Sequence, residues 1–342
     1  MSALQSVIKS VLEGRAPDAV AVEEGMHTIM RGEAEPVLFG GFLVALASRP
    51  VEPTHLAAAA RAMRAHRVAI HPQVRPLVDT CGTGGDGAGT FNISTAAAMV
   101  VAAAGCAVAK HGNRGVSSKV GSADVLEQLG CKLDLAPADA CRLIDATGFA
   151  FLFAPAFHPA MKHAAPVRRA LGVRTIFNML GPLANPALAE FQLMGVFDPS
   201  LTETMARTLL ELGSEGALVV HCAGLDEIGL HAPTTGHRLK DGKVTPVTIE
   251  PESLGIARQP VSALAGGDPT ANARIIRAAL GGGAGACSDI VALNAAAALE
   301  VAGHVADLGE GLVLARELME SGAAVAVIDR YSTSSRGTGG AA

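Results

Sequence analysis

The residue types at positions 79–95, DTCGTGGDGAGTFNIST, are those of a phosphate-binding loop. Within eight positions the segment holds Gly82, Gly84, Gly85, Gly87 and Gly89. Glycine permits positive φ angles and has no Cβ, so backbone N–H groups can approach a ligand closely. Asn92 and Ser94 then precede an apolar run, where such residues favour the start of a helix. Because exposed N–H groups followed by a helix N-terminus bind anions, the segment predicts a phosphate site.

Residues 82–87 also satisfy the pattern G-x-G-x-x-G of dinucleotide-binding loops, after an expected strand at 76–80. A dinucleotide site needs an acidic residue about 20 positions further on, which holds the ribose hydroxyls. No Asp or Glu occurs from Gly87 to Ala123. The stretch instead carries Lys110, His111, Arg114 and Lys119, which suit a ligand with several phosphates. A purely structural turn is the alternative.

A second loop, KHGNRGVSSKVGSAD at 110–124, combines three glycines, three serines and these four basic side chains. Charge-assisted hydrogen bonds to an anion contribute about 1.5–3 kcal/mol each. The composition predicts a ligand loop, with Ser122 capping the next helix. A solvated basic surface is the alternative.

Two further segments carry charged side chains at positions suited to ligands. In 151–187 an apolar helical face precedes Arg168 and Arg169, and one guanidinium pointing inward would pair bidentately with a carboxylate. The alternative is that both arginines are on the surface.

Asp226 and Glu227 follow a strand-like run at 217–222. Such acids are often solvated, yet Mg²⁺ binds through one or two carboxylates together with substrate phosphates.

The apolar spacing predicts the elements that position these residues. Residues 2–66 read as four helices, with Pro36 and Pro53 in first turns and Gly40-Gly41 at a close helix contact. From Leu77 onward, short apolar runs alternate with helical patterns, which predicts βαβ units and a mostly parallel sheet. Ligands bind beyond the carboxyl ends of such strands, so both glycine-bearing loops should meet there.

The remaining segments predict few functional features. Residues 233–249 indicate a hairpin, 272–280 and 290–305 indicate helices, and 281–285 a turn. The Ser-, Gly- and Thr-rich residues 331–342 predict a disordered tail.

Composition excludes several classes of protein. At 342 residues the chain suits one large and one smaller domain. A net charge of −5, with 1 Tyr and no Trp, disfavours nucleic-acid binding. The apolar run 96–109 is interrupted by Gly105 and is shorter than the roughly 20 residues of a membrane span. The first 16 residues lack the pattern of a signal peptide. The 6 cysteines show no C-x-x-C pair, so we expect neither zinc nor disulfides, and a cytoplasmic location.

The segments together resemble the anthranilate phosphoribosyltransferase family. The resemblance rests on four motifs in order: DTCGTGGDGAGTFNIST, KHGNRGVSSKVGSADVLEQLG, HPAMKHAAPVRRALGVRTIFNMLGPLANP and GLDE. It implies an α/β fold in which a small N-terminal helical domain is hinged to a large α/β domain with a mostly parallel central sheet flanked by helices. The helical domain would comprise residues 1–68 and about 165–190, and the α/β domain 69–164 and 191–330. A homodimer through the helical domain is also implied.

By position, the resemblance implies which residues bind each substrate. Residues that would bind 5-phosphoribosyl 1-diphosphate are Gly82, Gly85, Asp86, Thr90, Asn92, Ile93, Ser94, Thr95, Lys110, His111, Gly112, Asn113, Arg114, Gly115, Val116, Ser117, Ser118 and Ser122. Those that would contact anthranilate are Gly82, Asn113, His158 and Arg168. Two Mg²⁺ ions per subunit would bind at Ser94, Asp226 and Glu227, so that Lys110, Asp226 and Glu227 support the transition state.

The implied reaction, a step of tryptophan biosynthesis, is displacement of diphosphate from the ribose C1 by the anthranilate amine, with inversion. An aromatic amine is neutral at pH 7, so no strong base is required. No general base is identified, and His111 is either a base or a structural residue.

Two other functions remain as alternatives. A pyrimidine nucleoside phosphorylase would share the fold and the GTGGD segment, yet it gives no reason for HPAMKHAAPVRR or for the acidic pair. A non-catalytic nucleic-acid-binding paralogue would need an extended basic groove, which the net charge disfavours.

Overall fold

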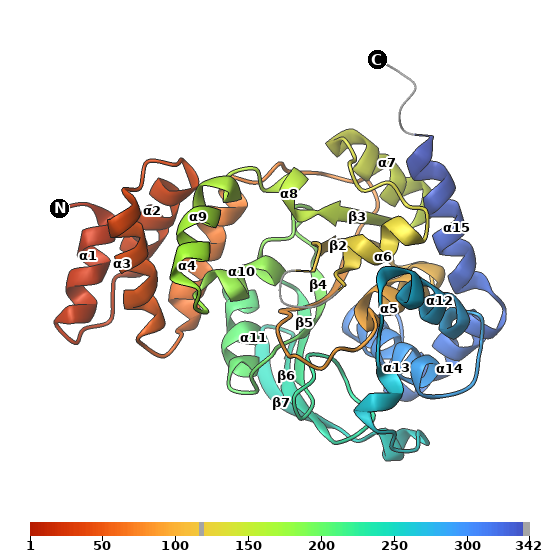
Figure 1. Ribbon diagram of the computed structural model, residues 1–342. Coiled ribbons are helices and arrows are strands. Elements are labelled where there is room, and N and C mark those ends of the chain that lie inside the picture. The colour runs from red at the N-terminus through yellow and green to blue at the C-terminus, as the bar shows by residue number, and fades with distance from the viewer. Residues whose placement is uncertain (116–119, 338–342) are drawn as a thin grey trace.

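Four N-terminal helices form the first part of a helical domain (Figure 1). The computed structural model describes residues 1–115 and 120–337. The helices are α1 (Ala3–Leu12), α2 (Ala19–Met30), α3 (Pro36–Ala47) and α4 (Pro53–Ala65), as the spacing predicts. The Asp18 and Glu35 side chains accept hydrogen bonds from backbone N–H groups at the starts of α2 and α3. A Cβ added to Gly41 would lie 3.2 Å from Ile8 Cδ1, which confirms the close helix contact.

Two later helices complete the helical domain. After α8 (Ala154–Phe157), α9 (Met161–Leu171) packs against α2 and α3, and α10 (Phe177–Leu183) packs against α4. Ala164, Phe177 and Leu180 share one hydrophobic core with the N-terminal helices. The chain therefore returns from the sheet to the helical domain, so one stretch contacts both parts of the molecule.

A sheet of seven strands in the order β3-β2-β1-β4-β5-β6-β7 forms the centre of the α/β domain. The first five in this order pair in parallel, and β6 and β7 pair antiparallel, which confirms the expected hairpin. The strands are β1 (Leu77–Gly82), β2 (Ala107–Gly112), β3 (Phe149–Phe153), β4 (Phe191–Gly195), β5 (Gly216–His221), β6 (Thr234–Lys240) and β7 (Lys243–Ile249). The strand order reverses between β1 and β4, which is where open α/β sheets bind ligands.

Helices cover both faces of this sheet. On one face, α5 packs against β1 and β2, and α13 against β4 and β5, while α11 packs against β5, β6 and α4. The helix predicted at 290–305 is α13, which begins at Ala286 and ends at Val301. The remaining elements are α5 (Ile93–Ala103), α6 (Ser122–Gln128), α7 (Pro137–Thr147), α11 (Leu201–Glu211), η1 (Pro251–Leu254), η2 (Val261–Leu264), α12 (Pro269–Leu280), α13 (Ala286–Val301), α14 (Leu308–Glu320) and α15 (Ala323–Arg336).

The predicted disordered tail at 331–342 is wrong for its first part, because α15 continues to Arg336. Tyr331 is fully buried, accepts a hydrogen bond from Phe151 N (3.1 Å) and meets Phe149 edge-on. Ser335 Oγ accepts a hydrogen bond from Lys132 N (3.1 Å). The polar composition indicated disorder, but these hydroxyls serve as hydrogen-bond partners for distant backbone. Residues 338–342 lie outside the described part of the chain.

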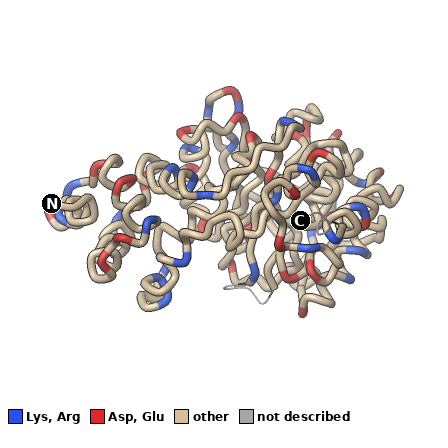
Figure 2. Tube along the Cα trace, turned by 90° about the horizontal axis from the view of Figure 1, so that it is seen from above, with Lys and Arg blue, Asp and Glu red and all other residues tan. Residues whose placement is uncertain are grey.

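Charges of both signs are interspersed along the described chain in the view of Figure 2. That distribution gives no support for a basic groove that tracks a nucleic acid. Within the described ranges, no helix has the length and apolar character needed to cross a membrane.

Candidate functional site

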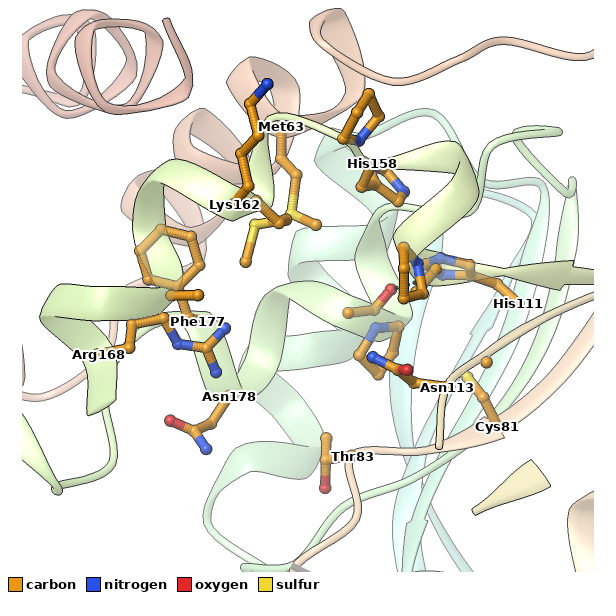
Figure 3. Close-up of a pocket in the computed structure, with 18 of the residues that line it drawn as sticks. Met63, Cys81, Thr83, His111, Asn113, His158, Lys162, Arg168, Phe177 and Asn178 are labelled. Atoms are coloured by element: carbon orange, nitrogen blue, oxygen red, sulfur yellow. Dashed lines mark hydrogen bonds between the residues drawn. The ribbon is translucent and has the colours of Figure 1, made fainter. Parts of the chain in front are cut away.

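Two adjoining cavities lie at the carboxyl ends of β1 and β2. A cavity of about 300 Å³ lies between the two glycine-bearing loops and the acidic pair. A larger cavity of about 610 Å³ extends toward α9 and α10 (Figure 3). Both are lined by Cys81, Gly82, Thr83, His111, Gly112 and Asn113. The shared lining places the two cavities next to one another.

The small cavity gathers most of the residues expected to bind the diphosphate substrate. All of them within the described ranges line it except Gly115. Val116, Ser117 and Ser118 lie outside the described residues. The loops that follow β1, β2 and β5 therefore meet at the small cavity.

The glycine-rich loop after β1 is pressed against the loop that carries Asp226. Gly84 and Gly85 have φ angles of 68° and 80°, which side-chain-bearing residues rarely adopt. A Cβ on Gly82 would collide with the Asp226 carboxylate. Gly84 N donates a hydrogen bond to Asp226 Oδ2 (2.7 Å). Glycine at these positions therefore permits both the turn and the close approach of the acid.

Asp226 and Glu227 are placed where they repel one another and neighbouring Asp86. Burial raises the pKa of Asp226 well above its usual range, and the charges of Glu227 and Asp86 raise it further. Burial likewise raises the pKa of Glu227 to about 7, although Lys110 opposes the shift. Asp226 N donates to Asp86 Oδ2 (3.4 Å). Three carboxyl groups are thus concentrated at one wall of the small cavity.

This wall fits a divalent cation that also binds a substrate. A cation would offset the repulsion among the carboxylates, and Mg²⁺ prefers such oxygen ligands. In the part of the chain that the structure describes, no three His, Cys, Asp or Glu side chains are arranged to hold a metal ion by themselves. A magnesium ion here would take its remaining ligands from water and from phosphate oxygens.

Asn92 does not cap α5 with its side chain, contrary to the sequence-based expectation. The helix begins after Asn92, but its side chain bonds Val120 O (3.2 Å) and Asn272 Nδ2 (3.1 Å). Ser94 N instead donates to Glu227 Oε1 (3.1 Å). An acid from a distant loop thus occupies the N-terminus of α5, where negative charge is favoured.

Lys110, at the end of β2, is buried with only 2% of its surface exposed. Its Nζ donates hydrogen bonds to Thr80 O and to Ser94 Oγ (3.3 Å for the latter). Burial lowers its pKa, while the charges of Asp79, Cys81 and Glu227 act in the opposite direction. The ammonium group therefore links β1, β2 and α5 at the wall of the small cavity.

Sequence reasoning missed Asp79 and Asn185, which support this arrangement. Burial raises the pKa of Asp79 to about 6, opposed by Lys110 and by its hydrogen bonds. Asn185 Nδ2 donates to Asp79 Oδ2 (2.8 Å) and to Ala109 O (2.7 Å). The pairing joins β1 and β2 to the turn after α10, and no local sequence pattern indicates it.

His111 is a buried histidine at the wall that the two cavities share. Its Nδ1 lies 3.1 Å from Gly181 O, and its ring centroid lies 5.1 Å from that of His158. Burial, followed by the charge of His158, lowers the pKa of His111 to about 3. The imidazole is therefore neutral and weakly basic at pH 7. His111 Nε2 has no hydrogen-bond partner within the described residues.

The second loop is held by Asp124 of α6, and Ser122 Oγ donates a further hydrogen bond to Asn113 O (3.4 Å). Asp124 Oδ2 accepts hydrogen bonds from Gly115 N (3.0 Å) and Gly121 N (2.8 Å), and Gly121 occupies the cap position. The prediction that Ser122 caps α6 is therefore wrong. Arg114 lines the small cavity, but its guanidinium pairs with Asp124 (3.0 Å) and Glu127 (2.8 Å).

The larger cavity contains a guanidinium beside apolar walls. Arg168 lies over the Phe177 ring at 5.0 Å, and burial lowers its pKa. Figure 3 shows it pointing toward Asn178, and it forms no ion pair with any described residue. Arg169 is exposed, so one of the two arginines faces inward. An unpaired guanidinium in such a cavity suits a flat, apolar carboxylate.

His158 lies at the wall shared with the β-sheet. It is buried, its Nε2 lies 2.8 Å from Ala184 O, and burial lowers its pKa to about 4. Sequence reasoning did not single out four other lining residues: Met63, Lys162, Phe177 and Asn178. Phe177 and Asn178 fall inside a motif that was recognised, but their positions in the cavity depend on the return of the chain to the helical domain.

Comparisons with known proteins agree with this architecture. The family described as "Glycosyl transferase family, a/b domain" matches residues 74–325, and "Glycosyl transferase family, helical bundle domain" matches residues 5–67. The anthranilate phosphoribosyltransferase of Thermomicrobium roseum is 51% identical over 330 residues, which cover 95% of each chain. The chain belongs to the anthranilate phosphoribosyltransferase family. The Symbiobacterium thermophilum enzyme is 49% identical over 96% of each chain.

Solved structures of this family share the whole fold. The crystal structure of the Thermus thermophilus enzyme has a TM-score of 0.92 at 45% identity, covering 97% of this chain and 99% of that one. The Saccharomyces cerevisiae enzyme in complex with PRPP and Mg has a TM-score of 0.88 at 27% identity, covering 98% of both chains. Another structure of the yeast enzyme contains 4-fluoroanthranilate. The family's fold, with a helical domain and an α/β domain, is therefore the fold of this chain.

Proposed function

We propose that this chain transfers the phosphoribosyl group of 5-phosphoribosyl 1-diphosphate to the amine of anthranilate. The products are N-(5-phosphoribosyl)anthranilate and diphosphate, in a step of tryptophan biosynthesis. One observation carries the proposal: a polar cavity with an acidic wall adjoins a cavity that holds an unpaired guanidinium. The comparisons support it through relatives that match along nearly the whole chain.

The donor would occupy the small cavity. Backbone N–H groups of the glycine-rich loop and the N-terminus of α5 would hold phosphate oxygens, once Gly84 N and Ser94 N exchange their carboxylate partners for phosphate. The second loop from Lys110 to Ser122 would close the other side of the donor. Arg114 would have to leave Asp124 and Glu127 to reach a phosphate, because both acids hold it here.

Ser94, Asp226 and Glu227 would hold magnesium, with two ions per subunit. Mg²⁺ is present in the yeast complex with PRPP. When bound, the metal neutralises negative charge that develops on the departing diphosphate. Glu227 would exchange its hydrogen bond with Ser94 N for a metal contact, and Lys110 would remain as a fixed positive charge beside the leaving group.

The acceptor would occupy the larger cavity. Arg168 would hold the anthranilate carboxylate, Asn113 and Gly82 would lie beside the amine, and His158 would line the path inward. The amine would attack C1 of the ribose from the face opposite the diphosphate, with inversion. Because the amine is neutral at pH 7, positioning supplies much of the acceleration, and a weakly basic His111 is compatible with the reaction.

The direct test follows the fluorescence of anthranilate after addition of 5-phosphoribosyl 1-diphosphate and Mg²⁺. We expect the signal to fall only when all three components and the protein are present. No loss of signal from folded protein would refute the proposed activity. Replacing anthranilate with inorganic phosphate and a pyrimidine nucleoside tests the phosphorylase alternative, for which we expect no turnover.

We further propose a homodimer formed through the helical domain, in a cytoplasmic enzyme. Leu12, Val37 and Val44 expose large apolar side chains on α1 and α3, which a partner would cover. All six cysteines are free, in keeping with a reducing compartment. We assign residues 1–68 and about 165–190 to the helical domain, and 69–164 with 191–330 to the α/β domain. Light scattering of the purified protein tests the dimer, and a monomeric mass would contradict it.

A further inference from the structure

The segment that joins α9 to α10 carries Arg174, which reaches the donor loop. Arg174 Nη2 donates a hydrogen bond to Gly85 O (2.7 Å). Its guanidinium carbon lies 3.9 Å from the centroid of the Phe197 ring, which follows β4. A guanidinium over an aromatic face is attracted by the ring electrons, so Phe197 helps to fix its position.

The glycine-rich loop is held from two sides, and Arg174 is one of them. Gly84 N donates to Asp226 Oδ2 (2.7 Å), whereas Gly85 O accepts from Arg174. Neither glycine has a side chain to pack, and a Cβ at Gly84 would meet only open space. These hydrogen bonds therefore set the orientation of the loop's peptide groups.

Arg174 does not line the acceptor cavity itself, but it lies in the segment between α9 and α10, two helices that do. Arg168 precedes it on α9, and Phe177 and Asn178 follow it on α10, all three of which line the larger cavity. Thr175 N donates to Asn178 Oδ1 (2.9 Å), which fixes the segment directly after Arg174. One side chain thus connects the segment between these two helices to the donor loop.

We propose that Arg174 is a positioning residue that holds the Gly84-Gly85 segment in the orientation needed for the diphosphate and its magnesium. The inference rests on the proposed function, and Arg174 itself touches neither reacting group. Without the guanidinium, Gly85 O would lose its donor and the Gly84 N–H could turn away from Asp226. Donor binding and magnesium use would then weaken, while the acceptor cavity would keep its own lining.

The test compares Arg174→Ala, Arg174→Lys and a matched control, Arg169→Ala. Arg169 is exposed on the neighbouring helix and forms no ion pair within the described ranges. For Arg174→Ala we expect KM for the diphosphate substrate to rise about five- to tenfold, which is less than a buried charge-assisted hydrogen bond would give, because the site is exposed. Arg174→Lys should recover part of this loss, because an ammonium can still donate to Gly85 O.

The two KM values separate positioning from a general loss of structure. In Arg174→Ala we expect the KM for anthranilate and the Tm to equal those of the unaltered enzyme within experimental error. Phe197→Leu should give a smaller rise in the KM of the donor, because it removes the ring and leaves the hydrogen bond. An unchanged donor KM in Arg174→Ala, or an equal rise in both KM values, would overturn the assignment. Inactivity of the unaltered protein would instead overturn the proposed function.

Discussion

Replacing Arg168 with alanine tests how the acceptor is recognised. The guanidinium is half-buried, lies over Phe177 and forms no ion pair within the described residues, so it is free to bind a carboxylate. A charge-assisted pairing of this kind contributes about 2 kcal/mol, which corresponds to about a 30-fold change in affinity. We therefore expect Arg168→Ala to raise KM for anthranilate about 30-fold.

The assay is the initial rate of anthranilate fluorescence loss, with each substrate varied while the other is saturating. KM for the diphosphate substrate should change far less, because Arg168 does not line the small cavity. Arg168→Lys should be intermediate, since an ammonium cannot pair bidentately. Arg169→Ala is the matched control and should behave like the unaltered enzyme. Equal losses for both substrates in Arg168→Ala would refute the reasoning.

Asp226→Asn combined with Glu227→Gln should lower kcat and raise the magnesium concentration for half-maximal rate; an unchanged magnesium titration would contradict their assignment. The pKa values of His111 and His158 are lowered to about 3 and 4, so protons bind them mainly in the unfolded state. The contribution of each histidine to stability should be fully present above pH 6.5 and fall toward pH 4, by up to about 1.4 kcal/mol per pH unit, while the raised pKa values of Asp79 and Glu227 act in the opposite direction. The free energy of unfolding of the unaltered protein minus that of His158→Gln isolates one histidine and should decrease as the pH falls from 6.5 to 4; a difference that does not change with pH would argue against the cause. Tyr331→Phe should cost about 1–3 kcal/mol in urea unfolding, because it leaves the buried Phe151 N–H without its acceptor; a neutral effect would show that another partner replaces the hydroxyl.

Sequence alone predicts the parts of the site that depend on local patterns. Clustered glycines after an apolar run indicate the loop after β1, and the alternation of runs places Lys110 at the end of a neighbouring strand. The structure brings these segments together at the edge expected for a parallel sheet. Such predictions succeed because positive φ angles and strand periodicity are set by neighbouring residues.

Partners that come from distant parts of the chain are harder to predict. Glu227 accepts Ser94 N from 133 residues away, and it takes the place of the cap expected from Asn92. Asn185 reaches Asp79 across 106 residues, and Arg174 reaches Gly85 across 89. The last two contacts depend on the return of the chain to the helical domain. The composition of the C-terminal residues likewise gives no sign that Tyr331 packs against β3.

The central claim is that the two glycine-bearing loops and the acidic pair enclose the diphosphate substrate together with magnesium. A crystal of the protein soaked with 5-phosphoribosyl 1-diphosphate and Mg²⁺ tests it most directly. We predict density for the diphosphate between the loops, with a metal ion in contact with Asp226 or Glu227. Well-diffracting crystals in which the substrate binds elsewhere, or in which this cavity stays empty at saturating concentrations, would contradict the claim.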